Sequence, residues 1–157
     1  MSEAPAVRSA RPEDIEKIVA FNAAIASETE SLALDHERLT AGVSAIFEDA
    51  SRGRYFVAER DGRLIGQAMV TTEWSDWRNG DVWWLQSVYV IPEARGKGVF
   101  TALFRAIETQ ARSNGARGLR LYVDRDNSRA QDIYLRLGMQ ASHYQMMEVD
   151  FVLSREG

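Results

Sequence analysis

The chain has 157 residues, of which 45% are hydrophobic and 10% aromatic, and these values are typical of one globular domain. A net charge of −4 without a basic stripe argues against a nucleic-acid partner, and zero cysteines exclude disulfides, thiolate catalysis and cysteine–metal sites. We find no apolar run long enough to span a membrane and no signal-peptide pattern. We therefore expect residues 1–157 to form a single cytoplasmic domain without a membrane partner.

The first half of the chain predicts helices followed by a hairpin. The expected elements, in chain order, are a strand at 6–9, a helix from Pro12, a helix at 35–47, and strands at 55–59 and 64–72. Asp35 is a typical N-cap residue for the second helix. Asp61-Gly62 predicts the tight turn of the hairpin.

The second half predicts alternating strands and helices. A polar loop at 75–81 precedes a strand at 82–91, and the helix that begins near residue 99 ends at Asn114-Gly115. Residues 119–123 are almost continuously apolar, which predicts a central strand. A helix at 128–137 closed by Gly138 follows, and residues 139–152 are expected to supply one or two final strands.

The turn Arg95-Gly96-Lys97-Gly98 joins a β-branched strand to an amphipathic helix, which is the setting of a phosphate site. Three phosphate-binding patterns compete for it. A Walker A loop requires a Lys-Ser/Thr pair that is missing, and a dinucleotide fingerprint requires glycine where Thr101 stands. The third pattern, R-x-x-G-x-G/A, binds the pyrophosphate of acetyl-CoA; Arg95 and Gly98 fit it, whereas Phe100 replaces its last small residue.

Two motifs in matching elements carry a resemblance to a known family. One is Val88-Tyr89-Val90-Ile91-Pro92 leading into the glycine turn, and the other is Asn127-x-x-Ala130-x-x-x-Tyr134-x-x-x-Gly138-Met139. Together with the order of elements, they resemble the GNAT (Gcn5-related) N-acetyltransferases over nearly the whole chain. The resemblance implies a mixed, mostly antiparallel central sheet flanked by helices and splayed between the fourth and fifth strands.

The resemblance also implies a binding site for acetyl-CoA as co-substrate. Backbone groups of Val88 and Val90 would pair with the pantetheine arm, and backbone N–H groups of the turn would hold the pyrophosphate. Phe100 is expected to enter the core first and to line the ligand second, since it shares a helix face with Leu103 and Phe104. The residues expected at the cofactor are Val88, Tyr89, Val90, Arg95, Gly96, Lys97, Gly98, Val99, Phe100, Thr101 and Asn127.

Tyr134 is the candidate general acid, because a phenol near the thioester could protonate the departing CoA thiolate. It shares one helix face with Asn127 and Ala130, which lie two turns and one turn earlier, respectively. The alternative for Tyr134 is a core tyrosine with a satisfied hydroxyl, and the alternative for Asn127 is a helix cap.

The general base is left open by the sequence. Family members often have a glutamate where this chain has Gln86, and glutamine cannot accept a proton. Glu28 is our first candidate, because acids at a helix C-terminus oppose the dipole and an unfavourable choice can mark a site for a cationic amine. A solvated loop explains it equally well, and the further carboxylates considered are Glu30, Glu73, Asp76 and Asp81.

The acceptor site is expected at the tryptophan-rich hairpin. Trp74 and Trp77, with Asp76, could form an aromatic and acidic wall that attracts a cationic or apolar amine, with Glu30 and Gln86 as further substrate residues. Trp83 and Trp84 alternate faces, so one of them is expected in the core. His36 and His143 have no ligand-spaced partners, and we expect no metal.

We therefore expect an N-acetyltransferase that moves an acetyl group from acetyl-CoA to a primary amine of a small molecule or peptide by direct attack. One alternative is a regulatory domain that binds acyl-CoA without catalysis, which Gln86 favours. Another is a protein-interaction module built on the tryptophan hairpin. A homodimer is compatible with the resemblance.

Overall fold

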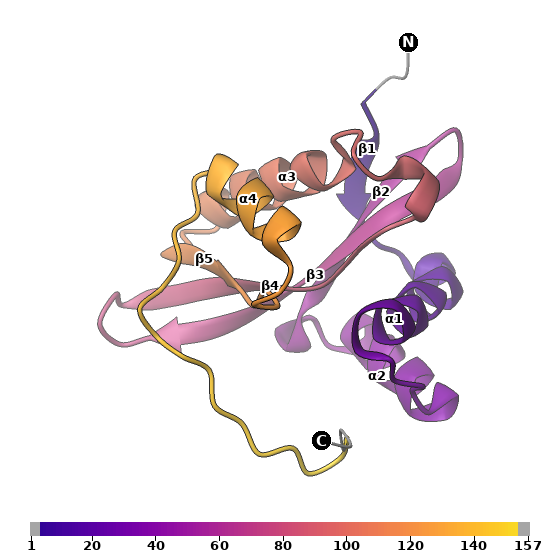
Figure 1. The fold of residues 1–157 in the computed structure, drawn as a ribbon, viewed down its shortest axis with the longest axis horizontal. Coiled ribbons are helices and arrows are strands. Elements are labelled where there is room, and N and C mark those ends of the chain that lie inside the picture. Colours follow the sequence, from indigo (N-terminus) through magenta and orange to yellow (C-terminus); the bar gives the residue numbers. More distant parts are fainter. Residues whose placement is uncertain (1–3, 154–157) are drawn as a thin grey trace. The chain divides into compact units, whose positions relative to one another are not determined.

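The computed structural model describes residues 4–153, which contain five strands and four α-helices (Figure 1). In chain order these are β1 (Ala6–Ser9), α1 (Ile15–Glu30), α2 (His36–Glu48), β2 (Arg54–Arg60), β3 (Arg63–Ser75), β4 (Gly80–Val90), α3 (Val99–Ser113), β5 (Gly118–Leu121) and α4 (Ser128–Arg136). The chain divides between Tyr122 and Val123 into two compact units. The sheet and α1–α3 belong to the first unit and α4 to the second, so the single-domain organisation stays a prediction.

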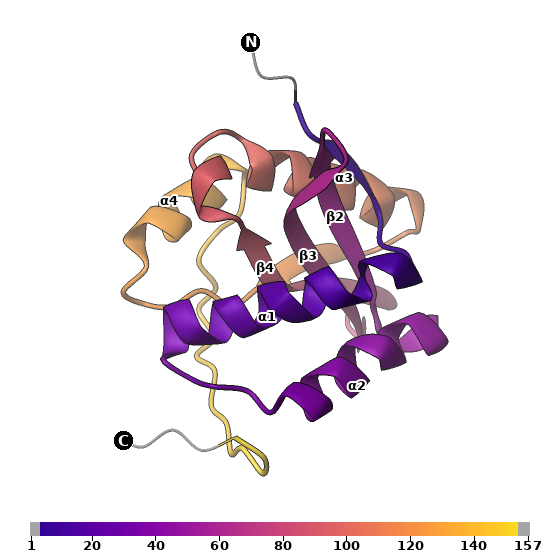
Figure 2. The same ribbon diagram turned by 90° about the vertical axis from the view of Figure 1, so that its right-hand side faces the viewer.

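The five strands form one sheet in the order β1-β2-β3-β4-β5. All neighbouring pairs are antiparallel except β4 and β5, which are parallel. Figure 2 shows α1 and α2 on one face of this sheet and α3 on the other. The predicted mixed, mostly antiparallel sheet flanked by helices is confirmed.

The sheet opens along β4. This strand pairs with β3 from Gly80 to Val90, whereas β5 pairs with it only from Val82 to Leu85. Among residues 4–153, no strand covers the other edge of β4 beyond Leu85. The splay expected between the fourth and fifth strands is therefore present, and it leaves the last five residues of β4 with one open edge.

The turns and caps predicted from the sequence are present. The Asp35 carboxylate accepts a 2.8 Å hydrogen bond from the Arg38 N–H at the start of α2. Asp61 and Gly62 form the hairpin turn with φ values of 52° and 74°. Gly138 ends α4 with a φ of 98°, and the next N–H, that of Met139, donates to the Tyr134 carbonyl over 3.0 Å.

Two expectations about strands are wrong. The apolar segment expected at the centre of the sheet is β5, which lies at its edge because no described residue pairs with its outer side. The final strands expected at 139–152 are absent, since none of these described residues belongs to a strand. In the described chain, no helix combines the length and hydropathy needed to cross a bilayer.

Gly66 lets α3 lie directly on β3. A Cβ atom at this position would meet the Val99 Cγ1 atom at 3.0 Å, the Tyr89 carbonyl oxygen at 3.1 Å and the Leu103 Cδ1 atom at 3.4 Å. Val99 and Leu103 belong to the first two turns of α3 and are buried. Because Gly66 has no side chain, the N-terminal turns of α3 can pack close to β3 at this position.

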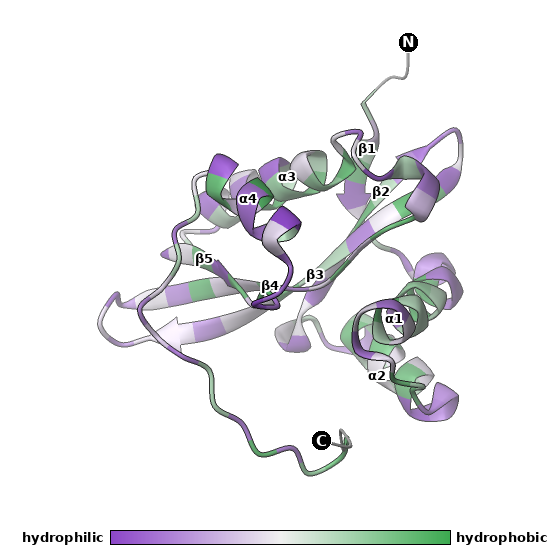
Figure 3. Ribbon diagram, viewed as in Figure 1, coloured by the Kyte–Doolittle hydropathy of each residue, from purple (hydrophilic) through white to green (hydrophobic). Residues whose placement is uncertain are grey.

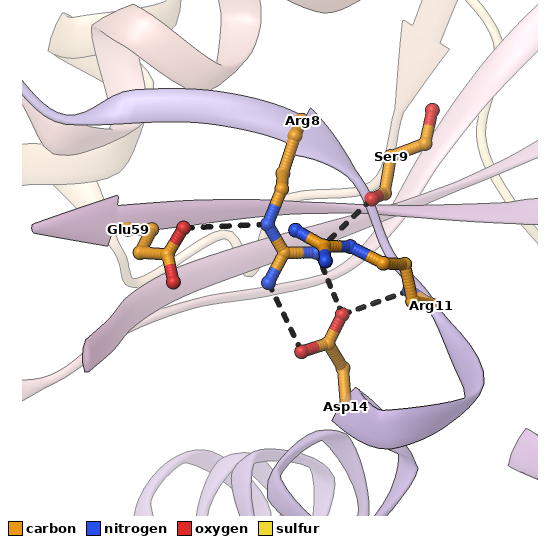
Figure 4. A network of polar contacts seen from close by, with 5 residues as sticks. All are labelled: Arg8, Ser9, Arg11, Asp14 and Glu59. Atoms are coloured by element: carbon orange, nitrogen blue, oxygen red, sulfur yellow. Dashed lines mark hydrogen bonds and ion pairs between the residues drawn. The ribbon is translucent and has the colours of Figure 1, made fainter. Parts of the chain in front are cut away.

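A buried arginine–carboxylate cluster ties β1 and β2 to the start of α1 (Figure 4). Arg8 binds Asp14 through two hydrogen bonds of 2.8 and 3.1 Å and reaches Glu59 of β2 at 3.4 Å. The Arg11 N–H also donates to Asp14, over 2.8 Å. The hydrogen bonds from Arg8 lower the pKa of Asp14 despite its burial, so the carboxylate is charged at neutral pH.

Substitution of Gly66 tests the close approach of α3. Gly66→Ala should lower the free energy of unfolding by about 1–3 kcal/mol, because a methyl group overpacks against α3 and a backbone oxygen. Gly42→Ala is the matched control, because its Cβ would meet nothing within 4 Å and alanine favours the helix interior by about 0.5–1 kcal/mol. Urea denaturation measures both. Equal stability of the two variants would contradict the packing described.

Candidate functional site

The open edge of β4 presents the backbone groups of Val88 and Val90. The Ile91 N–H donates to the Ile65 carbonyl of β3 over 3.0 Å, so Ile91 faces β3. Backbone groups of successive strand residues point to opposite edges, so those of Val90 face the open side, those of Tyr89 face β3, and those of Val88 face the open side again. These are the groups for which the sequence predicts a pantetheine partner.

A β-bulge lies where the open edge begins. The register of β3 and β4 shifts between Gln67 and Met69, and Ser87 opposite has a φ of 48°. The fully buried side chain of Gln67 donates from Nε2 to the Ser87 carbonyl over 2.9 Å. Gln67 therefore satisfies a carbonyl that the bulge removes from the ladder. We did not single it out from the sequence, where its signal is one amide in the apolar run from Leu64 to Val70.

Residues 91–98, which end in the glycine turn, connect β4 to the N-terminus of α3. Gly96 and Gly98 have φ values of 75° and 83°, and Gly98 is the N-cap of α3. The first hydrogen bond of α3 runs from the Ala102 N–H to the Gly98 carbonyl over 3.0 Å, so the backbone N–H groups of residues 99–101 precede the helix's own ladder. A Cβ atom at Gly98 would meet nothing within 4 Å. The turn thus offers backbone donors and the positive end of the helix dipole to an anion.

Phe100 does not obstruct these donors. Its side chain is half-buried, and its ring lies 6.1 Å from that of Phe104 on the same helix. The close helix approach that the family pattern places at this position is supplied instead by Gly66 on β3.

Arg95 links the end of α1 to the open edge. Its Nε donates to the Val90 carbonyl over 2.8 Å, and its Nη2 donates to the Glu28 carboxylate over 3.1 Å. Its guanidinium carbon lies 5.4 Å from the centre of the Tyr89 ring. Lys97, the second cation of the turn, donates from Nζ to the Glu93 carbonyl over 3.0 Å.

The surroundings of Glu28 favour its charged form. A hydrogen bond from the Tyr89 hydroxyl and the neighbouring Arg95 lower the pKa of Glu28. A carboxylate with a lowered pKa is a weak proton acceptor at neutral pH. Glu30 lies two residues further along, exposed at the last position of α1.

The structure separates the two groups of acceptor residues predicted from the sequence. Glu28 binds Arg95, which also donates to Val90 at one end of β4, whereas Trp74, Asp76 and Trp77 surround the turn that enters its other end. The strand has 11 residues, so it spans about 35 Å. Trp74 and Trp77 are 64% and 84% exposed. One acceptor pocket cannot include both groups.

A polar and aromatic surface lies next to the bulge. The Gln86 amide donates to the Thr71 hydroxyl over 2.5 Å, and the Trp84 indole donates to Glu73 over 3.2 Å. Gln86 and Trp84 alternate along β4 and share a face, as do Thr71 and Glu73 on β3. We call these four residues the bulge face.

Residues of β5 and its end border the bulge face. Arg120 Nη1 donates to Glu73 over 2.7 Å, and the Tyr122 ring lies 4.7 Å from that of Trp84. Trp83 points to the other face of the sheet and is buried, which confirms that one of the two adjacent tryptophans is in the core.

The second unit holds Asn127 and Tyr134. The Asn127 side chain accepts a 3.1 Å hydrogen bond from the Ala130 N–H and caps α4, which confirms its capping role. Burial raises the pKa of Tyr134. The contribution of either residue to the site around the open edge stays a prediction, because they belong to a separate unit.

The sequence pattern of the acetyltransferase (GNAT) family matches residues 19–139, which include most of the first unit and the beginning of the second. A possible acetyltransferase from Clostridium difficile, known from its crystal structure, is 40% identical with a TM-score of 0.86, covering 96% of this chain and 100% of that one. A predicted acetyltransferase from Clostridium acetobutylicum, solved with acetyl-CoA, shares the fold at 16% identity with a TM-score of 0.76, covering 94% and 97% of the two chains.

Several curated relatives match over shorter stretches. The thialysine N-epsilon-acetyltransferase of Bos taurus is 32% identical over 77 residues, which are 49% of this chain and 45% of that protein. The chain spans about half or less of the first such relatives, with shares of 45%, 38% and 56% of their lengths. The family match nevertheless covers well over half of the chain and includes the open edge, the glycine turn and α4. The chain therefore belongs to the GNAT family of acetyltransferases.

Proposed function

We propose that this protein transfers an acetyl group from acetyl-CoA to a primary amine. The observation that carries the proposal is the open edge of β4, which residues 91–98, with a 3-10 turn at Pro92–Ala94 and the glycine turn, join to the N-terminus of α3. Val88 and Val90 present the backbone donors and acceptors that an extended amide-containing arm requires. The N–H groups at the start of α3 present the donors that a pyrophosphate requires. The residues present thus fit acetyl-CoA, which would supply an activated thioester.

From the direction of the edge we infer that the chemistry takes place near the bulge. If phosphates bind at the start of α3, the arm extends back along β4 past Val90 and then Val88. The acyl end then lies near Ser87 and Gln86, where β5 has left the sheet. The Val88 N–H faces this open side and is suited to polarise a carbonyl that accumulates negative charge during attack.

We infer that the acceptor amine approaches over the bulge face. Glu73 is the carboxylate of that face, and it is shared between Arg120 and the Trp84 indole. A carboxylate beside an indole attracts an ammonium group by charge and by cation–π interaction. Glu73 is therefore our candidate for holding the amine and for receiving its proton, directly or through water.

Glu28 is assigned a positioning role in this proposal. Its contact with Arg95 lies at the phosphate end of the edge, and its lowered pKa suits an ion pair better than proton abstraction. Arg95 donates to Val90 through Nε and to Glu28 through Nη2, which uses part of its five N–H donors. Trp74, Asp76 and Trp77 lie at the far end of β4, so we give them no role at the reacting atoms.

Tyr134 is the proposed proton donor to the departing thiolate. Its raised pKa keeps the phenol protonated at neutral pH, so that a proton is available. A thiol has an ordinary pKa of about 8.5, so complete transfer from the phenol is uphill and a hydrogen bond to the sulfur is the main contribution.

A regulatory acyl-CoA-binding domain is the second candidate function. Gln86 favours it, because this amide occupies the place of the expected base and donates to Thr71. Under either function we expect the protein to act in the cytoplasm, as its sequence predicts.

The two ends of α3 allow a controlled test of the phosphate site. Gly98→Ala and Gly115→Ala each force alanine into a left-handed conformation, with φ of 83° and 74°, and each should cost about 1–2 kcal/mol of stability. Only Gly98 lies at the predicted pyrophosphate, so only Gly98→Ala should weaken CoA binding, by tenfold or more in calorimetric titration. Equal loss of affinity in both variants would contradict the site.

Release of free CoA across a panel of primary amines tests the proposed activity. Turnover is expected with at least one amine, and Glu73→Gln should raise the KM for that amine or lower kcat by at least tenfold without changing CoA affinity. Tyr134→Phe should lower kcat at unchanged CoA affinity, whereas the control Tyr144→Phe should leave kcat as it is. Tight acetyl-CoA binding without turnover on any amine would favour the regulatory alternative.

A further inference from the structure

Gln67 is a polar side chain in an apolar part of the sheet. It interrupts the apolar run from Leu64 to Val70 of β3 and is fully buried. Hydrophobic positions cluster where β2 and β3 run side by side (Figure 3). Its Nε2 atom donates to the Ser87 carbonyl over 2.9 Å, whereas no described group donates to its Oε1 atom. A buried acceptor without a donor destabilises the folded state, so core packing alone does not explain this amide.

The hydrogen bond from Gln67 sets the direction of a peptide group. The Ser87 carbonyl and the Val88 N–H belong to the same peptide group, which is trans, so the two point in opposite directions. The Nε2 atom of Gln67 holds the carbonyl toward β3. The Val88 N–H therefore points to the opposite, open side of β4. A buried side chain on one side of the strand thus directs a backbone donor on the other.

This peptide group lacks the restraint that a ladder normally supplies. The described register of β3 and β4 pairs neither Ser87 nor Val88 with a residue of β3, because it shifts at this point. Ser87 has a φ of 48°, which is uncommon for a residue with a Cβ atom. Such a conformation persists only where its surroundings hold it. Gln67 supplies a restraint of this kind, since it binds the Ser87 carbonyl from the core.

We propose that Gln67 is a positioning residue for the thioester carbonyl of acetyl-CoA. Through the Ser87 carbonyl it directs the Val88 N–H toward the acyl end of the bound arm. The Val88 N–H donates to the thioester oxygen, which gains negative charge when the amine attacks, and a donor held in advance needs no reorientation during this step. The inference rests on the acetyl-CoA site proposed above, but it does not require turnover.

Binding of acetyl-CoA and of CoA tests this role, because CoA has no thioester carbonyl. Gln67→Met removes the amide and keeps an unbranched side chain of similar volume. The Ser87–Val88 peptide group then loses its restraint, and the donor loses its direction. In calorimetric titration the variant should bind acetyl-CoA about two- to tenfold more weakly, which is the usual contribution of one hydrogen bond. Its affinity for CoA should equal that of the wild type.

The carbon-13 resonance of acetyl-CoA labelled at the thioester carbonyl reports the same hydrogen bond directly. A hydrogen bond to a carbonyl oxygen withdraws electron density from the carbonyl carbon and moves its resonance downfield. Binding to the wild-type protein should produce such a shift. Gln67→Met should return the resonance toward the position of free acetyl-CoA.

Val43→Ala is the matched control for a loss of stability. It removes buried volume from α2, which packs against α1 and β2, and should lower the free energy of unfolding. The ratio of the two affinities and the carbonyl resonance should stay as in the wild type.

Turnover supplies a separate readout. With an amine that the wild-type protein acetylates, Gln67→Met should lower kcat at least tenfold at unchanged CoA affinity. Absence of turnover in the wild type would count against acetyl transfer, and the two binding measurements would then decide the role of Gln67. Equal losses of affinity for CoA and acetyl-CoA would limit Gln67 to supporting the fold. That result, or an unchanged carbonyl resonance in Gln67→Met, would overturn the proposal.

Discussion

The divergence of β5 from β4 after Leu85 is the constraint on which the rest of the site depends. A sheet strand normally uses both edges, and leaving five residues of β4 with one open edge costs hydrogen bonds that a ligand can restore. The bulge at Ser87 bends the strand at that point, and the Gln67 amide satisfies the carbonyl that it displaces. The buried Gln67 side chain thus stabilises the bulge at which the open edge begins.

The same region shows how packing on one face supports binding at an edge. Gly66 admits α3 to close contact with β3, which brings the helix N-terminus to the end of the open edge. Backbone donors of the strand and of the helix then lie at the two ends of the connecting segment 91–98. This arrangement matches a ligand that has amides in one part and phosphates in another.

Local patterns in the sequence predicted local structure well. The left-handed glycines at 96, 98 and 138 and the Asp35 and Asn127 caps depend on residues that are close in the chain. Contacts between distant residues could not be predicted in this way. Glu28 and Arg95 are 67 positions apart, and their ion pair follows from where α1 ends. Our proposal that Glu28 positions Arg95 is based on this contact. The distance between Glu28 and the tryptophan hairpin likewise follows only from the length and pairing of β4.

Hydrogen–deuterium exchange at single-residue resolution tests the open edge most directly. Addition of CoA should slow exchange at the amides of Val88 and Val90 and of residues 99–101, because these groups face the ligand. The Tyr89 amide, which faces β3, should be protected with and without CoA. The account would be contradicted if CoA bound tightly while exchange at Val88 and Val90 stayed unchanged.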